Sequence, residues 1–101
     1  MAINSLPSIV ASGMQAAQAQ LQVSANNIAN LNTEGYHRQE LQQSAQAQGG
    51  VSTSVRRAAE AGSDLEADVV AQLQAKNAFL ANLAVFKTSN KMQGALLDEA
   101  A

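Results

Sequence analysis

Hydrophobic and small side chains recur every seven residues along the first third of the chain. One series consists of Met14, Leu21 and Ile28. A second series, interleaved with the first, consists of Val10, Ala17, Ser24 and Leu31. Such series are the a and d positions of a heptad repeat, which predicts a helix with one buried side over residues 4–31. The repeat leaves open whether that side faces the same chain or a second molecule.

The N-terminal end of this first helix contains residues that are typical of a helix start. Ser5 is placed to cap its N-terminus, and Pro7 fits the first turn, where a missing N–H costs nothing.

A second amphipathic pattern covers residues 64–97. Its apolar stripe consists of Leu65, Val69, Leu73, Leu80 and Leu83. Ser63 or Asp64 can cap a helix here, and Glu66 and Asp68 place negative charge at the positive end of its dipole. We therefore predict a second long helix. Three leucines of the stripe, at positions 73, 80 and 83, are expected to pack against the Met14 series of the first helix.

The segment between the helices, residues 32–63, has a different pattern. Asn32 to Gly35 is a turn cluster in which Gly35 can adopt a positive φ. Residues 36–43 and 51–57 are predicted strands. In the second, Val51, Thr53 and Val55 alternate with serines, which is the period of two typical of a strand. Gln48 to Gly50 can form the turn between them. The sequence thus predicts one mainly α domain over residues 1–101. Its two long terminal helices form an antiparallel helical hairpin or coiled coil with a short β-hairpin-like insert.

Composition restricts the core and the partners. Hydrophobic residues make up 47% of the chain but aromatic residues only 3%, so close-packed helices are favoured over a bulky core. The net charge of −2 gives no indication of a nucleic-acid partner. No stretch approaches the roughly 20 apolar residues of a membrane span, so no membrane insertion is expected. The first residues lack the pattern of a secretory signal peptide, so any export is expected to proceed without a cleaved leader.

The residues that could carry catalysis have simpler explanations. His37 is the only histidine and there is no cysteine, which argues against a histidine-rich or thiolate metal site. We expect His37 to be solvated. The acidic cluster of Asp64, Glu66 and Asp68 is explained by its place at a helix start. The sequence therefore predicts that the protein is not an enzyme and needs no cofactor or metal.

Asparagines crowd the end of the first helix, in the stretch Ala-Asn-Asn-Ile-Ala-Asn-Leu-Asn that begins at Ala25. Asn30 or Asn32 can end the helix in left-handed geometry. Asn26 and Asn27 remain inside the helix, where uncharged amides suit specific contacts in a subunit interface. The residues alone leave both interpretations open.

Two segments resemble bacterial flagellar axial proteins, the family of rod, hook and hook-associated subunits. Residues 12–39 resemble the N-terminal motif of that family, which is matched by Ala25, Asn26, Asn27, Ile28, Ala29, Asn30, Asn32, Thr33, Gly35 and Tyr36. Residues 68–98 are similar to its C-terminal helix, notably at Ala81-Asn82, Lys87-Thr88, Met92 and Leu96-Leu97. The two segments cover more than half of the chain, in the family's order.

The resemblance implies a structural subunit of the flagellar basal-body rod. In that family the terminal helices pair as a coiled coil and pack side by side into the inner tube. It implies as partners the protein itself, other rod or hook subunits and the flagellar type III export apparatus, and a location in the periplasm-spanning basal body. The expected assembly interface consists of Met14, Leu21, Asn26, Asn27, Ile28, Asn30, Asn32, Gly35, Tyr36, Leu73, Leu80 and Leu83.

The middle segment leaves no room for the extra domain that hook and distal-rod proteins of the family insert, and even the small proximal-rod subunits are usually longer. An alternative is therefore a cytoplasmic helical binding module, or export adaptor, that mimics axial subunits. Location and open-ended assembly distinguish the two hypotheses.

Overall fold

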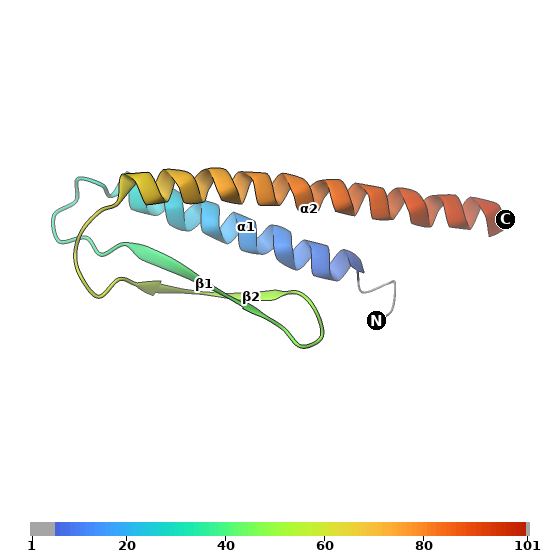
Figure 1. Ribbon diagram of the computed structural model, residues 1–101, viewed down its shortest axis with the longest axis horizontal. Coiled ribbons are helices and arrows are strands. Elements are labelled where there is room, and N and C mark those ends of the chain that lie inside the picture. Colours follow the sequence, from blue (N-terminus) through green and yellow to red (C-terminus); the bar gives the residue numbers. More distant parts are fainter. Residues whose placement is uncertain (1–5, 101) are drawn as a thin grey trace.

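The computed structural model describes the backbone of residues 6–100 and the side chains of residues 6–97. Helix α1 (Leu6–Ala29) and helix α2 (Leu65–Ala100) are joined through a hairpin of strands β1 (Gln39–Ala45) and β2 (Val51–Arg57). Figure 1 shows the two helices running antiparallel, with the longer α2 extending past α1. The predicted antiparallel helical hairpin with a β-hairpin insert is confirmed. Asn4 and Ser5, including the expected cap, lie outside the described residues.

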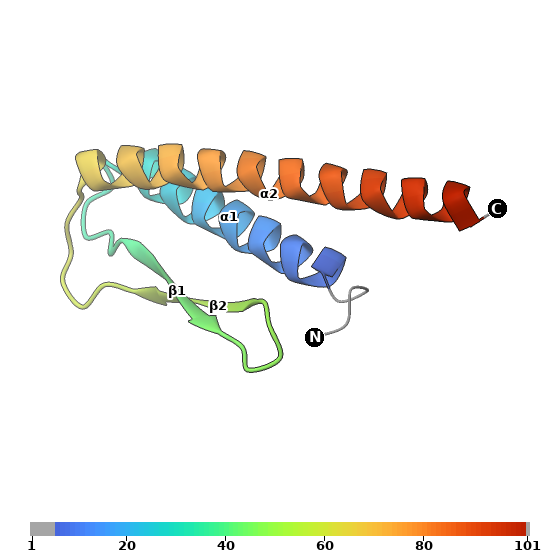
Figure 2. The same ribbon diagram turned by 45° about the vertical axis from the view of Figure 1, so that its right-hand side comes forward.

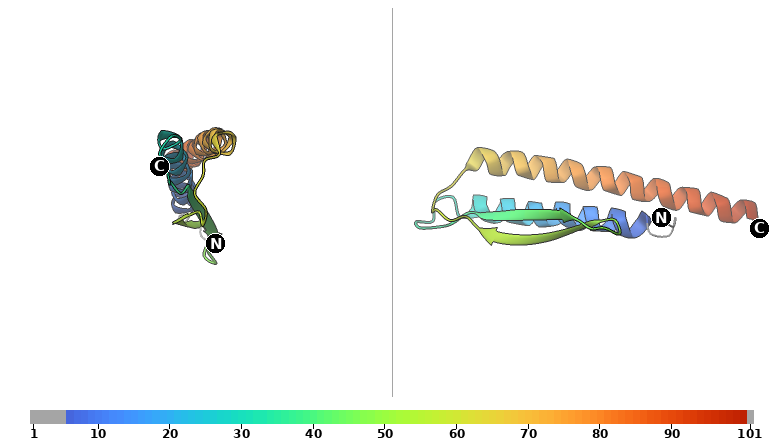
Figure 3. Two further views of the ribbon diagram at one scale, coloured as in Figure 1. Left: turned by 90° about the vertical axis from the view of Figure 1, so that its left-hand side faces the viewer. Right: turned by 60° about the horizontal axis from the view of Figure 1, so that its bottom comes forward.

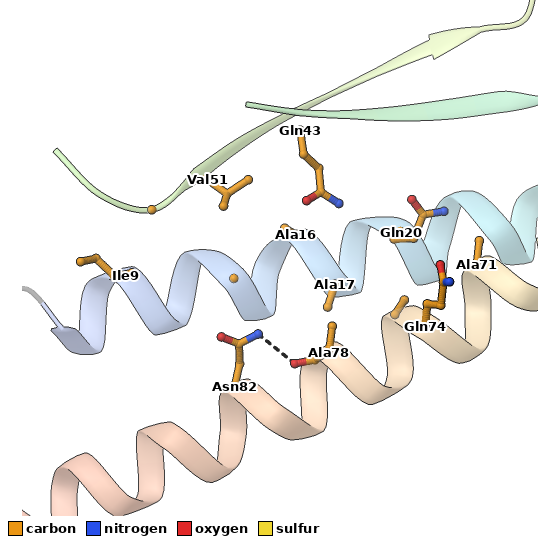
Figure 4. Close-up of a pocket in the computed structure, with 13 residues that line it drawn as sticks. Ile9, Ala16, Ala17, Gln20, Gln43, Val51, Ala71, Gln74, Ala78 and Asn82 are labelled. Atoms are coloured by element: carbon orange, nitrogen blue, oxygen red, sulfur yellow. Dashed lines mark hydrogen bonds between the residues drawn. The ribbon is translucent and has the colours of Figure 1, made fainter. Parts of the chain in front are cut away.

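Helix α1 lies between α2 and the β-hairpin (Figures 2 and 3). Neighbouring alanines on α1 point to different sides of the helix, Ala17 toward α2 and Ala16 toward the hairpin (Figure 4). Val10 and Ser24 share the side of Ala17 by their spacing of seven, and Val23 shares the side of Ala16. All five residues are buried. Helix α1 therefore has two buried sides, although its heptad repeat predicted only one.

Small residues bring the helices close together. A Cβ atom at Gly13 would lie 2.8 Å from Oδ1 of Asn82 on α2. The buried apolar side chains of the described residues are Val10, Ala16, Ala17, Val23 and Ala75. An interface of alanines and valines buries little apolar area, so hydrophobic burial alone contributes modestly to the stability of this fold.

The side of α2 that faces α1 differs from the prediction. Most of its buried and half-buried positions alternate in steps of four and three: Asp68, Gln72, Ala75, Phe79, Asn82, Phe86, Ser89 and Gln93. Leu73 and Leu80, expected at the helix interface, are 57% and 50% exposed. The expected packing of these two leucines against α1 is therefore wrong. The small and polar residues at positions 68, 75, 82 and 89 allow a closer helix approach than a leucine seam would.

The hairpin has an uninterrupted antiparallel register from Gln39↔Arg57 to Ala45↔Val51. Its turn is closed by a hydrogen bond from the N–H of Gln46 to the carbonyl of Gly50, and Gly50 has a φ of 89° that suits glycine. The predicted second strand, residues 51–57, is confirmed. The first begins three residues later than predicted, at Gln39, because Tyr36 to Arg38 form the connection from the helix.

Both helix ends at the base of the molecule are defined by side chains. Asp64, one of the two predicted capping residues, caps α2. Its Oδ1 accepts a 3.1 Å hydrogen bond from the N–H of Ala67. Helix α1 ends at Ala29, earlier than predicted. The expectation of a left-handed asparagine is wrong, because Asn30 and Asn32 have negative φ and only Gly35 in this turn has a positive one, 74°.

Within the described residues, neither helix contains a stretch apolar enough to span a bilayer.

Candidate functional site

Asn27 is the most completely bonded polar side chain at the base of the molecule. It is 2% exposed. Its Oδ1 accepts hydrogen bonds from the N–H of Gln39 at 2.8 Å and from the hydroxyl of Tyr36 at 3.1 Å. Its Nδ2 donates to the carbonyl of Gln39 at 2.9 Å and to Oδ1 of Asp68 at 3.1 Å. This single amide thus joins α1, the start of β1 and the first turn of α2.

Asp68 connects the same amide to a cation. The carboxylate is 3% exposed, and its two oxygens accept hydrogen bonds from Nη2 and, at 3.2 Å, from Nε of Arg38. The hydrogen bond to Asp68 raises the pKa of Arg38 above its ordinary value, while partial burial acts in the opposite direction. A buried carboxylate needs such a partner, because an unpaired charge in the interior is costly. We call Asn27, Arg38 and Asp68, with the backbone of Gln39, the amide clasp.

Asn26 and Asn30 of the motif belong to a chain of hydrogen bonds at the surface. Nδ2 of Asn30 donates to the carbonyl oxygen and to Oδ1 of Asn26, both at 2.9 Å. The hydroxyl of Thr33 donates to Oδ1 of Asn30 at 3.1 Å. The hydroxyl of Tyr36 lies 3.0 Å from Oδ1 of Asn26, so its one proton has both Asn26 and Asn27 as acceptors. These amides end α1 and hold the turn against it.

The loop residues on either side of the hairpin base are also paired. Nδ1 of His37 lies 2.8 Å from the carbonyl of Ala58, and His37 is half-buried, so this histidine is less solvated than expected. The guanidinium of Arg57 lies 5.8 Å from the centre of the Tyr36 ring, within cation–π range. Both contacts close the base of the hairpin.

The expected interface residues separate into distinct groups. Asn27 is buried in the amide clasp, whereas Asn26, Asn32 and Gly35 are exposed. Met14, Leu21 and Ile28 are half-buried along the flank of α1, and Leu83 is half-buried on α2. Leu73 and Leu80 face outward. The structure therefore connects the asparagine motif to α2 through Asn27. It does not pack Leu73 and Leu80 against the Met14 series of α1.

Helix α2 presents an outward aliphatic stripe. Its members share one side of the helix through spacings of four, four and seven, and all are at least two-fifths exposed: Leu65, Val69, Leu73 and Leu80. We call this set the α2 stripe. Farther along the helix Val85, Met92, Leu96 and Leu97 are also exposed. A row of exposed aliphatic side chains is typical of an interaction surface.

A groove between α1, the hairpin and α2 has alanines at its floor and amides at its edge (Figure 4). It is lined by Ile9, Gly13, Ala16, Ala17, Gln20, Gln43, Gly50, Val51, Ala71, Gln74, Ala75, Ala78 and Asn82. None of these side chains titrates, so the groove offers no general acid or base. The described residues also contain no group of three or more histidine, cysteine or acidic residues that could hold a metal ion.

Sequence reasoning missed the role of Asp68, which it interpreted only as a dipole charge. A signal was present, since Asp68 begins a series of small and polar residues, Ala75, Asn82 and Ser89, at spacings of seven. That series marks the side of α2 that lies against α1.

These features define a class of protein: a helical hairpin whose polar residues hold its own elements together and whose aliphatic residues face outward. Comparison with known protein families shows which family the first part of the chain is similar to. Residues 9–37, from the second turn of α1 to the connection before β1, match the family model described as flagella basal body rod protein. The match includes Asn27 and Tyr36 and confirms the resemblance of the N-terminal segment to the rod family. The matched family consists of structural rod proteins, not enzymes. A comparison with curated proteins finds no match.

Proposed function

We propose that this protein is a structural subunit of the bacterial flagellar basal-body rod. The family match over residues 9–37 supports a rod component and a location in the basal body. The finer proposal is that the chain assembles with itself and with other axial subunits through its terminal helices, in coiled-coil fashion. The α2 stripe carries this proposal.

The stripe is a suitable lateral contact. Completely burying one leucine or valine contributes about 1.5–3 kcal/mol, and the four members of the stripe are only partly buried in the isolated chain. Their joint burial between subunits therefore supplies apolar area that the alanine-rich interior lacks. Such a contact is also open to repetition, because α2 is a long straight element along the molecule (Figure 1).

In this proposal Asn27 contributes to assembly by positioning. The bond between Asn27 and Asp68 fixes the rotation of α2 about its axis, which turns Leu65 and Leu73 outward. The exposed Asn26, Asn32 and Gly35, together with half-buried Asn30, Tyr36, Met14, Leu21 and Ile28, remain proposed contacts to neighbouring subunits.

The experiment compares two charge substitutions on the same helix. Leu73→Glu places a carboxylate in the α2 stripe, and we expect it to abolish incorporation into basal bodies and to reduce motility. Ala81→Glu, at an exposed position outside the stripe, is expected to assemble normally. Normal assembly of Leu73→Glu, with the variant folded and expressed, would contradict the proposed stripe contact.

Export is tested separately. We propose that the chain leaves through the flagellar type III apparatus with an uncleaved N-terminus and becomes part of the periplasm-spanning structure. Fractionation of tagged protein from cells with and without a working export gate is expected to find it in the basal-body fraction only when the gate works. Retention in the cytoplasm of both strains, with an intact tag, would instead support a cytoplasmic binding module or export adaptor.

A further inference from the structure

The hydrogen-bond pattern of the hairpin shows which backbone groups point outward. Gln46 bonds to Gly50 across the turn, and the N–H of Ala58 bonds to the carbonyl of Arg38 at 2.8 Å beyond the base. Bonded and non-bonded pairs alternate in an antiparallel ladder. In the observed register, the even-numbered residues of β1 therefore bond to β2, and its odd-numbered residues direct their N–H and C=O groups away from it.

Helix α1 already occupies one outward position on each strand. The amide of Asn27 bonds both outward groups of Gln39, as a neighbouring strand would. On the other edge, the hydroxyl of Ser12 accepts a 3.1 Å bond from the N–H of Val51. The outward groups of Leu41, Gln43 and Ala45 on β1 bond to no other described residue. Those of Thr53, Val55 and Arg57 on β2 are in the same situation.

The open edge of β1 lacks the features that normally protect an edge strand. Residues 41–55 contain no charged residue and no proline. The register has no bulge, and the strand is held at both ends of the hairpin by α1. Protected edges usually carry lysine, proline or a bulge, and an edge without them is a template for another strand.

We propose that the β1 edge pairs with the β1 edge of a second copy of this chain, which forms a four-stranded sheet across a two-fold axis at Gln43. This surface is distinct from the α2 stripe and does not depend on it. In this register Gln43 faces Gln43 of the other copy, and Leu41 faces Ala45. These outward residues exchange about six backbone hydrogen bonds.

Charge favours this edge and this partner. Glu40 is the only charged residue of β1, and the proposed register places it opposite the neutral Gln46 of the other copy. The β2 edge instead carries Arg56 and Arg57, and Arg57 is engaged with Tyr36 and the carbonyl of His37. Pairing of two β1 edges thus brings no like charges together.

The first test uses disulfide cross-linking, which is clean because the chain has no cysteine. Gln42 and Ser44 are exposed and would face each other across the two copies, at Cα distances that a disulfide can span. A mixture of Gln42→Cys and Ser44→Cys chains is expected to form the heterodimer on mild oxidation, more than either chain forms its homodimer. The matched control is a mixture of Ser52→Cys and Ser54→Cys chains, which samples the β2 edge and is expected to form no disulfide-linked dimer. Both mixtures also carry Leu73→Glu, so that failure of the stripe contact does not affect the result.

The second test removes one outward donor, in the same Leu73→Glu background. Gln43→Pro deletes an N–H that makes no bond to β2, whereas Gln43→Ala keeps that N–H. We expect Gln43→Pro to weaken dimerisation about tenfold in sedimentation equilibrium, and Gln43→Ala and Thr53→Pro to leave it unchanged. Circular dichroism of each variant checks that the fold is retained. No heterodimer in the Gln42→Cys and Ser44→Cys mixture, equal cross-linking in the control mixture, or greater weakening by Thr53→Pro would each overturn the proposal.

Discussion

At the scale of single residues, Asn27 shows why an asparagine occupies a helix position for which leucine has the higher helix propensity. Its amide supplies two donors and one acceptor oxygen without a charge, and every one of them is used. A leucine there would leave both outward groups of Gln39 and one contact of Asp68 unsatisfied. The residue is therefore required by hydrogen-bond geometry within the chain.

Replacing that amide by a carboxylate tests the amide clasp directly. Asn27→Asp removes both donors and places a negative charge against Asp68, so we expect the free energy of unfolding to fall by about 3 kcal/mol or more. Asn26→Asp is the matched control, since Asn26 is exposed and acts there through an acceptor oxygen. Urea unfolding followed by circular dichroism measures both. Equal stability of the two variants would contradict the assigned role of Asn27.

The ion pair within the clasp has its own test. Asp68→Ala leaves Arg38 and one donor of Asn27 without their partner, and we expect a loss of about 2 kcal/mol, since Arg38 is partly exposed and can be hydrated. Glu66→Ala removes a charge from the same helix turn at an exposed position and is expected to cost much less. The midpoints of urea unfolding compare the two. A larger loss for Glu66→Ala would indicate that the dipole, and not the clasp, is the main contribution of these acids.

At the scale of elements, the rotation of α2 is the main departure from the sequence pattern. The helix turns small and polar residues toward α1 and aliphatic residues outward. Two contacts fix this rotation: Asn27 to Asp68 at the base, and the close approach of Gly13 to Asn82 nearer the middle of α1. The apolar stripe at Leu65, Leu73 and Leu80 had predicted a different side of the helix.

The close approach of the helices can be measured by a double substitution. Gly13→Ala should gain about 1 kcal/mol of helix propensity, but its methyl group would displace the side chain of Asn82. We expect most of this gain to appear only when Asn82→Ala is also present. A double-mutant cycle from thermal or urea unfolding gives the coupling. Additive effects would show that the helices are farther apart at this point than the structure indicates.

At the scale of the whole molecule, a thin interior is combined with exposed aliphatic residues along a body 63 Å long and 24 Å wide. The interior is built from alanines and valines, while the larger leucines of the α2 stripe are at the surface. Much of the apolar area that could stabilise this chain is therefore available only through contact with another molecule. This arrangement suits a subunit of a larger structure.

This arrangement predicts that stability depends on concentration. Association stabilises the folded state by mass action, so the Tm of the isolated protein should rise as its concentration is raised. Leu73→Glu should reduce this dependence, whereas Ala81→Glu should preserve it. A hundredfold rise in protein concentration stabilises the associated state by about 2.7 kcal/mol through mass action. Calorimetry over that range therefore gives a measurable shift in Tm. A Tm independent of concentration for the unsubstituted chain would contradict association through the stripe.

The sequence by itself determined the order and approximate bounds of the elements. Heptad spacing, an acidic capping turn and a strand with period two are local signals, each formed by residues close together in the chain. For the same reason residues 51–57 and the cap at Asp64 agree with the structure. The motif around Asn27 also indicated the similarity to rod proteins, because it is a continuous segment.

Only the tertiary structure decided which side of α2 is buried and what the asparagines bond. Asn27 and Asp68 are 41 positions apart, and the hydrogen bond between them forms only when α1, the hairpin base and α2 come together. A helical pattern reports where apolar residues gather, but the cost of burying Asp68 without Arg38 and Asn27 decided how α2 turns. Leu73 and Leu80, predicted for the interior, therefore lie outside, because distant residues decided the hydrogen bonding at the base of the molecule.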